Sequence, residues 1–165
     1  MKHLNFTRGP YSLTTNPRRF DIDAVHGSLS RTGKSWARGI PKKLVTKSIA
    51  HSLCFGLFHG KKQIGFARIV TDYSTYAYLC DVYVLKAYQG RGLGKWMIEK
   101  VVGHPELQGL RRFQLVTRDA HSLYKRFGFK RVAAAQYHME IFKPGLYETR
   151  EPRKHETHER RNSEN

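Results

Sequence analysis

The spacing of hydrophobic residues near the start of the chain predicts two helices. In residues 22–29 apolar side chains recur at helical spacing, and Asp21 just before them is a suitable N-cap. Residues 44–49 repeat the pattern, and Pro41 stands where the first turn of a second helix would begin. Ahead of both lies a short predicted strand over residues 11–15, after ten residues that look irregular.

From residue 52 the pattern changes to that of β-strands. Three runs are rich in β-branched and aromatic residues, and each is bounded by a short turn. Gly60 lies in the first of these turns and residues 72–75 form the second. Because such short connections join antiparallel neighbours, we expect a meander of three strands over residues 52–58, 63–71 and 78–85.

The second half of the chain predicts a helix, a strand, a shorter helix and a final strand. The first helix has its apolar positions within residues 93–101, and the strand over 112–117 is expected beside the strand over 78–85. Asp119 is expected to cap a helix over 120–127, and a last strand is predicted over 137–142. The whole pattern is that of a mixed α/β domain.

Composition places this domain in residues 1–147. The remaining 148–165 contain no aliphatic or aromatic residue, so we expect a disordered, charged tail. Acidic and basic residues balance in the tail, and the net charge of +17 therefore belongs to the domain. Such a charge favours anionic partners, among them nucleic acid, acidic membrane and a polyanionic cofactor such as coenzyme A. With two cysteines and no long apolar run, the expected compartment is the cytoplasm.

A glycine-rich loop joins the strand over 78–85 to the helix that follows it. Its sequence is Gln89-Gly90-Arg91-Gly92-Leu93-Gly94. The first amides of a helix have no partners within the helix, and the helix dipole adds positive charge there, so the loop is suited to binding phosphate. The chain has neither the Gly-Lys-Ser/Thr run of a Walker loop nor the setting of a dinucleotide-binding fingerprint.

Two motifs resemble the GNAT superfamily of acyl-CoA N-acyltransferases. The first is a Q-x-x-G-x-G loop after a strand ending in Val-x-x-x-Tyr, which here covers Val82 to Gly94. The second is an A-x-x-L-Y-x-x-x-G-F segment, which here covers Ala120 to Phe129. The resemblance extends from about residue 10 to residue 143. It implies a largely antiparallel central sheet with helices on both faces.

The resemblance also implies an activity, the transfer of an acetyl group from acetyl-CoA to a primary amine by direct attack in a ternary complex. We expect a small-molecule amine, with a protein lysine or N-terminus as the alternative. A non-catalytic protein that binds nucleic acid or senses acyl-CoA is a further alternative. No metal is expected, because the histidines lack metal-binding spacing. Nucleic acid and membrane are not the expected partners, and the chain would be a monomer or a homodimer.

Roles for individual residues follow from the same resemblance. Tyr124 would protonate the departing thiolate, because a phenol with a pKa of about 10 is protonated at neutral pH. Asp81 would either accept the amine proton or form a structural ion pair with Arg68. A backbone amide beside the thioester would polarise its carbonyl. The residues expected to bind acetyl-CoA are Val82, Tyr83, Val84, Gln89, Gly90, Arg91, Gly92, Leu93, Gly94, Lys95 and Thr117.

Thr117 departs from the asparagine that many relatives carry at that position, although its hydroxyl could still donate a hydrogen bond.

The acceptor would be enclosed by the early helices and their connections, where Trp36, Arg38 and Tyr73 are candidate wall residues. Trp36 could equally be an ordinary core residue. Nothing in the sequence identifies the amine.

Overall fold

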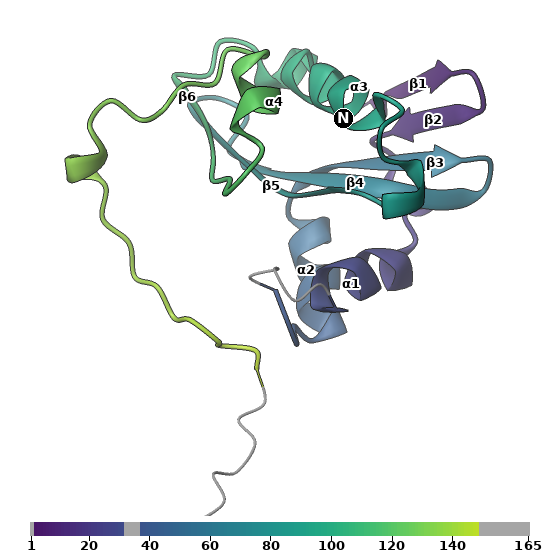
Figure 1. Ribbon diagram of the computed structural model, residues 1–165, viewed down its shortest axis with the longest axis horizontal. Helices are drawn as coiled ribbons and strands as arrows, with labels where there is room; N and C mark the ends of the chain where they lie inside the picture. The colour runs from purple at the N-terminus through teal and green to yellow at the C-terminus, as the bar shows by residue number, and fades with distance from the viewer. Residues whose placement is uncertain (1, 32–36, 149–165) are drawn as a thin grey trace, which may run out of the picture.

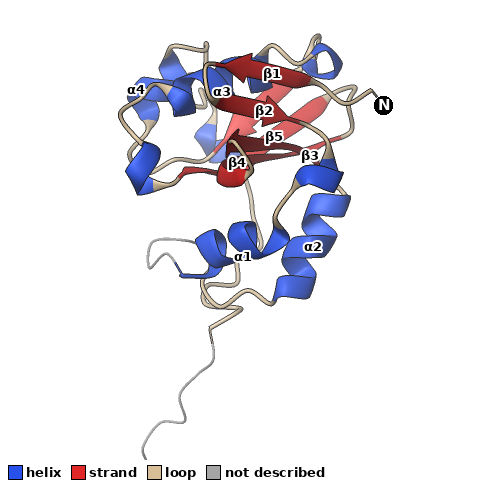
Figure 2. Cartoon of the chain, turned by 90° about the vertical axis from the view of Figure 1, so that its right-hand side faces the viewer, coloured by secondary structure: helices blue, strands red, loops and turns tan. Residues whose placement is uncertain are grey.

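A computed structural model describes residues 2–31 and 37–148. These residues form a six-stranded sheet with helices on both of its faces (Figures 1 and 2). The strands are β1 (Asn5–Arg8), β2 (Tyr11–Thr14), β3 (Leu53–His59), β4 (Lys62–Thr71), β5 (Tyr76–Val84) and β6 (Arg112–Leu115). The helices are α1 (Ile22–Arg31), α2 (Lys42–Ala50), α3 (Leu93–Val102) and α4 (His121–Lys125). Short 3₁₀ turns are η1 (Pro17–Arg19), η2 (Lys86–Tyr88), η3 (Pro105–Leu107) and η4 (Ala135–Tyr137).

The strands lie in the sheet in the order of the sequence, β1-β2-β3-β4-β5-β6. Each pair from β1 to β5 is antiparallel, and β6 joins β5 in parallel. The parallel pair requires a crossover, which α3 provides. The expected mixed α/β fold with a largely antiparallel sheet is thereby confirmed.

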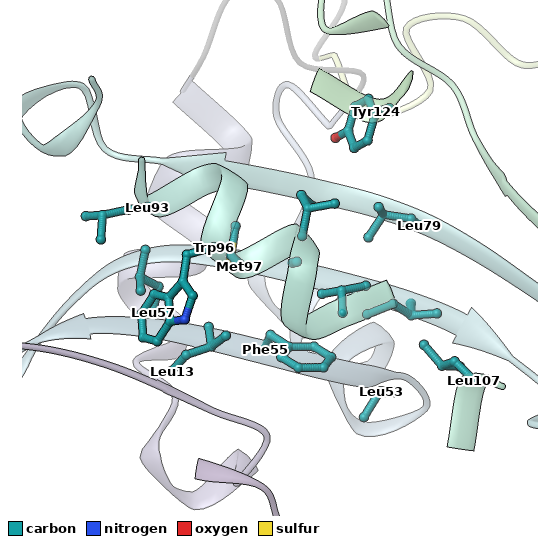
Figure 3. Packing of buried hydrophobic residues seen from close by; sticks show 14 of the residues in the cluster. Leu13, Leu53, Phe55, Leu57, Leu79, Leu93, Trp96, Met97, Leu107 and Tyr124 are labelled. Atoms are coloured by element: carbon teal, nitrogen blue, oxygen red, sulfur yellow. The ribbon is translucent and has the colours of Figure 1, made fainter. Parts of the chain in front are cut away.

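Two hydrophobic clusters hold helices to the two faces of the sheet. On one face Trp96 and Met97 of α3 pack against Phe55 and Leu57 of β3, and the cluster extends to Tyr124 of α4 (Figure 3). On the other face Val25 of α1 and Val45 of α2 pack with residues of β3 and β4, among them Cys54, Phe58 and Phe66. We call these the α3 face and the α1 face. Because β3 and β4 are covered on both faces, their sequences are nearly continuous apolar runs.

Most of the predicted elements are present, and the predicted start of α1 is confirmed in detail. The Asp21 carboxylate accepts a hydrogen bond from the Ala24 amide over 2.9 Å, as an N-cap does. The first ten residues, expected to be irregular, contain β1, which pairs with β2. The expected cap of α4 by Asp119 is wrong, because the Thr117 hydroxyl accepts the Ala120 amide over 3.1 Å instead.

The last predicted strand is also absent. Residues 137–142 form no strand, and they lie away from the sheet on the segment that follows α4 (Figure 1). A strand needs a partner for its backbone, and this segment has none within the part of the chain that the structure describes. The charged tail lies outside the described residues from position 149 onward.

Candidate active site

The central strand β5 contains a bulge at Asp81. Phe66 of β4 pairs with Tyr83 and Arg68 pairs with Cys80, so the single residue Ala67 lies opposite both Asp81 and Val82. Asp81 has a φ of 53°, a left-handed conformation that aspartate adopts more readily than most residues. The extra residue changes the alternation of side chains along the strand. Leu79 and Val82 therefore both pack on the α3 face, although three positions separate them.

β5 and β6 separate immediately before this bulge. Their pairing ends at Leu79 and Leu115, whereas the pairing of β5 with β4 continues to Val84. Among the described residues, the backbone of β5 from Cys80 to Val84 therefore has no strand beside it on the β6 side. An amide in this position can donate to a ligand placed between the two strands. It is already oriented by the β4 ladder, which is what stabilising a developing oxyanion requires.

The glycine loop begins a few residues after this open stretch. Gly90 and Gly92 have φ values of 77° and 73°, which only glycine adopts without strain. Gly92 is the N-cap of α3 and offers no side chain to its amides. The Gln89 side chain donates to the carbonyl of Val84 over 2.8 Å and so ties the loop to the end of β5. The helix terminus is thus open to an anion, at a fixed place relative to the unpaired backbone.

Two arginine side chains, Arg91 and Arg8, make hydrogen bonds that hold this loop in place. The Arg91 guanidinium donates to the Tyr11 hydroxyl over 3.0 Å and to the Ala87 carbonyl over 3.3 Å, which holds the loop against β2. Arg8 of β1 instead donates to the Gly92 carbonyl over 3.4 Å. A cavity of about 350 Å³ lies beside Arg8 and Gly92, and Lys95 also lines it. The residues around Arg8 do not predict this contact, because its partner Gly92 is 84 positions away along the chain.

Tyr124 lies in a second cavity, of about 400 Å³, at the β6 end of the site. Tyr124 is 8% exposed, and its ring packs edge-on against Phe129, with 5.8 Å between ring centres. Burial raises the pKa of the Tyr124 phenol, so the group is protonated at neutral pH. Thr117 lines the same cavity. Its hydroxyl accepts the Ala120 amide and keeps its own proton to donate.

The Asp81 carboxylate forms an ion pair with Arg68, with 2.5 Å between Oδ2 and Nε. Both side chains are buried, with 2% of Asp81 and 11% of Arg68 exposed. Arg68 also donates to the Ser52 hydroxyl over 3.3 Å. The second oxygen of Asp81, Oδ1, is buried and has no hydrogen-bond partner among the described residues. The structure thus contains the ion pair, and it leaves one oxygen of the carboxylate unengaged.

The remaining predicted residues lie in less informative places. Tyr73 packs at the edge of the α3 face. Arg38 is exposed and lies between Ala37 and Ile40, which belong to the α1 face, so these two candidate wall residues are not brought together. Trp36 lies outside the described residues.

Two absences concern the described residues alone. No group of three or more His, Cys, Asp or Glu side chains among them could hold a metal ion. None of their helices has the length and apolar character needed to span a membrane.

Comparisons with known proteins agree with this geometry. The model of the acetyltransferase (GNAT) family matches residues 26–129. A protein of Gibberella zeae named as a candidate acetyltransferase is 34% identical over 151 residues, which cover 78% of this chain and 84% of that protein. The crystal structure of a candidate GNAT-family acetyltransferase from Xanthomonas campestris pv. campestris superposes with a TM-score of 0.82 at 47% identity. That match covers 84% of this chain and 97% of the Xanthomonas chain.

More distant structures share the fold alone. The glucosamine-6-phosphate N-acetyltransferase of Arabidopsis thaliana superposes with a TM-score of 0.56 at 14% identity, over 80% of this chain and 97% of that one. The match to the family model, the Gibberella relative and the Xanthomonas structure together settle the classification. The chain belongs to the GNAT family of acetyltransferases.

Proposed function

We propose that this acetyltransferase moves the acetyl group of acetyl-CoA to a primary amine by direct attack in a ternary complex. The observation that carries the proposal is that two stretches of backbone have amides that can bind a ligand. One is the stretch of β5 beyond Leu79 that β6 leaves unpaired, and the other is the bare N-terminus of α3 after Gly92. A ligand with a thioester at one end and a pyrophosphate further along needs one such site for each of these two groups.

The residues of the loop fit the phosphates of such a ligand. Glycines with positive φ allow the backbone amides to approach an anion closely, and the helix dipole favours negative charge there. Lys95 lies at the same helix terminus and lines the adjoining cavity. Acetyl-CoA supplies an acetyl group activated as a thioester. One of the amides of Val82 to Val84 would then donate to the thioester oxygen.

Tyr124 is our proposed source of the proton that acetyl transfer requires. As the amine nitrogen bonds to the carbonyl carbon, the carbon–sulfur bond breaks and the sulfur takes a proton from an acid. A buried phenol that stays protonated at neutral pH can be that acid. Thr117 lines the same cavity and could donate a hydrogen bond to the sulfur.

For Asp81 we propose the structural role rather than that of base. Its Oδ2 is engaged by Arg68, and both side chains are buried. The pair joins β4 and β5 at the bulge, so it fixes the point at which β5 turns its backbone toward the substrate. The amine would then react in its neutral form and lose its proton to water.

The proposed acceptor is a small-molecule amine, because α1 and α2 are short, at 10 and 9 residues. A soybean protein named histone acetyltransferase is 48% identical over 42 residues, which are 26% of this chain and 18% of that protein. This local match keeps a protein acceptor as the second candidate. The net charge of +17 keeps a nucleic-acid-binding function as an outcome to be tested.

The test is a turnover screen of the purified protein with acetyl-CoA. Polyamines, amino acids, aromatic amines, lysine peptides and peptides with free N-termini are offered separately, and thiol release and acetylated product are both measured. We expect turnover with a small amine and little with peptides. Turnover of peptides alone would make a protein the acceptor. No turnover with any amine, together with RNA or DNA binding that persists at physiological salt, would overturn the proposal.

A further inference from the structure

The N-terminal hairpin of β1 and β2 contacts the glycine loop, although it lies outside the part of the chain that matches the family. That part begins at residue 26, whereas the two strands lie within residues 5–14. Two side chains of the hairpin make hydrogen bonds to the loop, Arg8 from β1 and Tyr11 from β2. The contribution of the hairpin therefore has to be inferred from the contacts of this chain itself.

The register of the sheet brings these side chains to one place. Arg8 pairs with Tyr11 across β1 and β2, and Tyr11 pairs with His59 of β3. His59 in turn pairs with Lys62 of β4. Directly opposite residues project from the same face of a sheet. The four side chains therefore form one row across four strands, beside the turns that join β1 to β2 and β3 to β4.

Tyr11 belongs to a closed cycle of contacting side chains, which we call the Tyr11 cluster and which consists of Tyr11, His59, Tyr88 and Arg91. The ring centres of Tyr11 and His59 lie 5.2 Å apart, and those of His59 and Tyr88 lie 5.6 Å apart. The Arg91 guanidinium lies 5.4 Å from the centre of the Tyr88 ring. It also donates to the Tyr11 hydroxyl over 3.0 Å, which closes the cycle. The cluster thus joins β2 and β3 to the glycine loop.

The loop depends on such attachments because its glycines have no side chains to hold it. Gly90 and Gly92 flank Arg91, and there is open space where a side chain of Gly90 would lie. Glycine loses more conformational freedom on ordering than any other residue. A loop that becomes ordered only when its ligand binds binds that ligand more weakly than a loop that is already ordered. Because Arg91 stands between the two glycines, fixing its side chain restricts the backbone on both sides.

We infer that Tyr11 is a positioning residue, which holds the glycine loop through Arg91 in the conformation that binds the phosphates of acetyl-CoA. The inference rests on the proposed function, which puts those phosphates at the loop. Arg8 supports the same loop from the same hairpin, because it donates to the Gly92 carbonyl over 3.4 Å. The hairpin thereby favours acyl donors that carry phosphates over donors that lack them.

The first test measures the loop in the protein without ligand. Tyr11→Phe removes the hydroxyl that accepts Arg91 and keeps the ring that packs against His59. The NMR order parameters of the amides of residues 90–92 should fall from about 0.85, typical of rigid backbone, toward about 0.6. The matched control is Tyr76→Phe, which removes a hydroxyl that donates to Gln114 over 2.9 Å at the other end of β5. The control should leave these order parameters unchanged, and unchanged values in Tyr11→Phe would overturn the inference.

The second test measures the affinity for coenzyme A by calorimetry. Tyr11→Phe should raise the dissociation constant about 3–10-fold, which corresponds to the net contribution of one hydrogen bond. Tyr76→Phe should bind as the wild type does. A double-mutant cycle with Arg91→Met then tests the route, because Tyr11→Phe should cause no further loss once the Arg91 guanidinium is absent. A dissociation constant unchanged by Tyr11→Phe would overturn the inference, and so would additive losses in the cycle.

The third test compares two acyl donors, with the amine that the turnover screen identifies as acceptor. Tyr11→Phe should raise KM for acetyl-CoA about 3–10-fold and leave kcat unchanged. Its kcat/KM for S-acetylpantetheine, which has no phosphate, should equal that of the wild type. Equal falls in kcat/KM for the two donors would indicate general damage to the fold and overturn the inference. A wild-type protein that binds no coenzyme A would instead overturn the proposed function, while the order parameters would still decide whether Tyr11 holds the loop.

Discussion

Replacing Asp81 by Asn tests whether its carboxylate belongs to the fold or to the chemistry. Asparagine also tolerates the left-handed conformation at this position, so the bulge itself should survive. The change leaves the buried Arg68 guanidinium without its counter-charge. Removing one partner of a buried ion pair costs about 3–5 kcal/mol, because the remaining charge is uncompensated. We expect a loss of this size in the free energy of unfolding.

The assay is urea unfolding followed by far-ultraviolet circular dichroism, with kcat/KM measured against pH on the same samples. The double variant Arg68→Met, Asp81→Asn removes both charges and should recover most of the lost stability. The shape of the pH profile should not change in the folded single variant. If Asp81→Asn unfolds within about 1 kcal/mol of the wild type while activity falls most steeply at low pH, the carboxylate is the base and our assignment is wrong.

Three further outcomes follow from the site and the core. Tyr124→Phe should lower kcat by about 10² and leave acetyl-CoA affinity nearly unchanged, and unaltered turnover would remove Tyr124 from the mechanism. Gly92→Ala should cost about 1–2 kcal/mol of stability from its φ of 73° and also weaken coenzyme A binding by calorimetry. Gly109→Ala, with a φ of 76° in open space away from the loop, should cost the same stability but not affect binding. Equal binding losses in the two variants would contradict anion binding by the glycine loop. Burial lowers the pKa of His104, so the stability that the neutral side chain contributes should be full above pH ~6.5 and should fall as the pH drops below that value. In urea titrations at several pH values, the non-titrating variant His104→Asn should lack this fall. Equal losses of stability in the variant and the wild type would show that His104 is not responsible.

The elements that the sequence predicted well are those with a strong local pattern. The runs that became β3, β4 and β5 are apolar on both faces, and the loop before α3 contains glycines where the backbone needs positive φ. Asp21 is followed directly by helical periodicity, so its cap was predictable too. In each case the signal and the structure that it specifies lie within a few residues of each other.

The features that escaped prediction depend on contacts between distant residues. The bulge at Asp81 comes from the register of β5 against β4, which no local pattern shows. β1 has only Phe6 as an apolar anchor, and Arg8 reaches the glycine loop solely because β1 joins the far edge of the sheet. The segment 137–142 has the pattern of a strand, and the described part of the chain gives it no strand partner. A strand pattern indicates what a segment can pair with but not where that partner lies.

Amide-resolved NMR titration of the protein with acetyl-CoA tests the central claim most directly. We propose that the coenzyme lies along the unpaired backbone of β5, with its phosphates at the N-terminus of α3. The backbone amides of residues 82–84 and 91–95 should therefore shift together, with one saturation curve. A titration that moves neither stretch, or that moves only the amides of α1 and α2, would contradict the account.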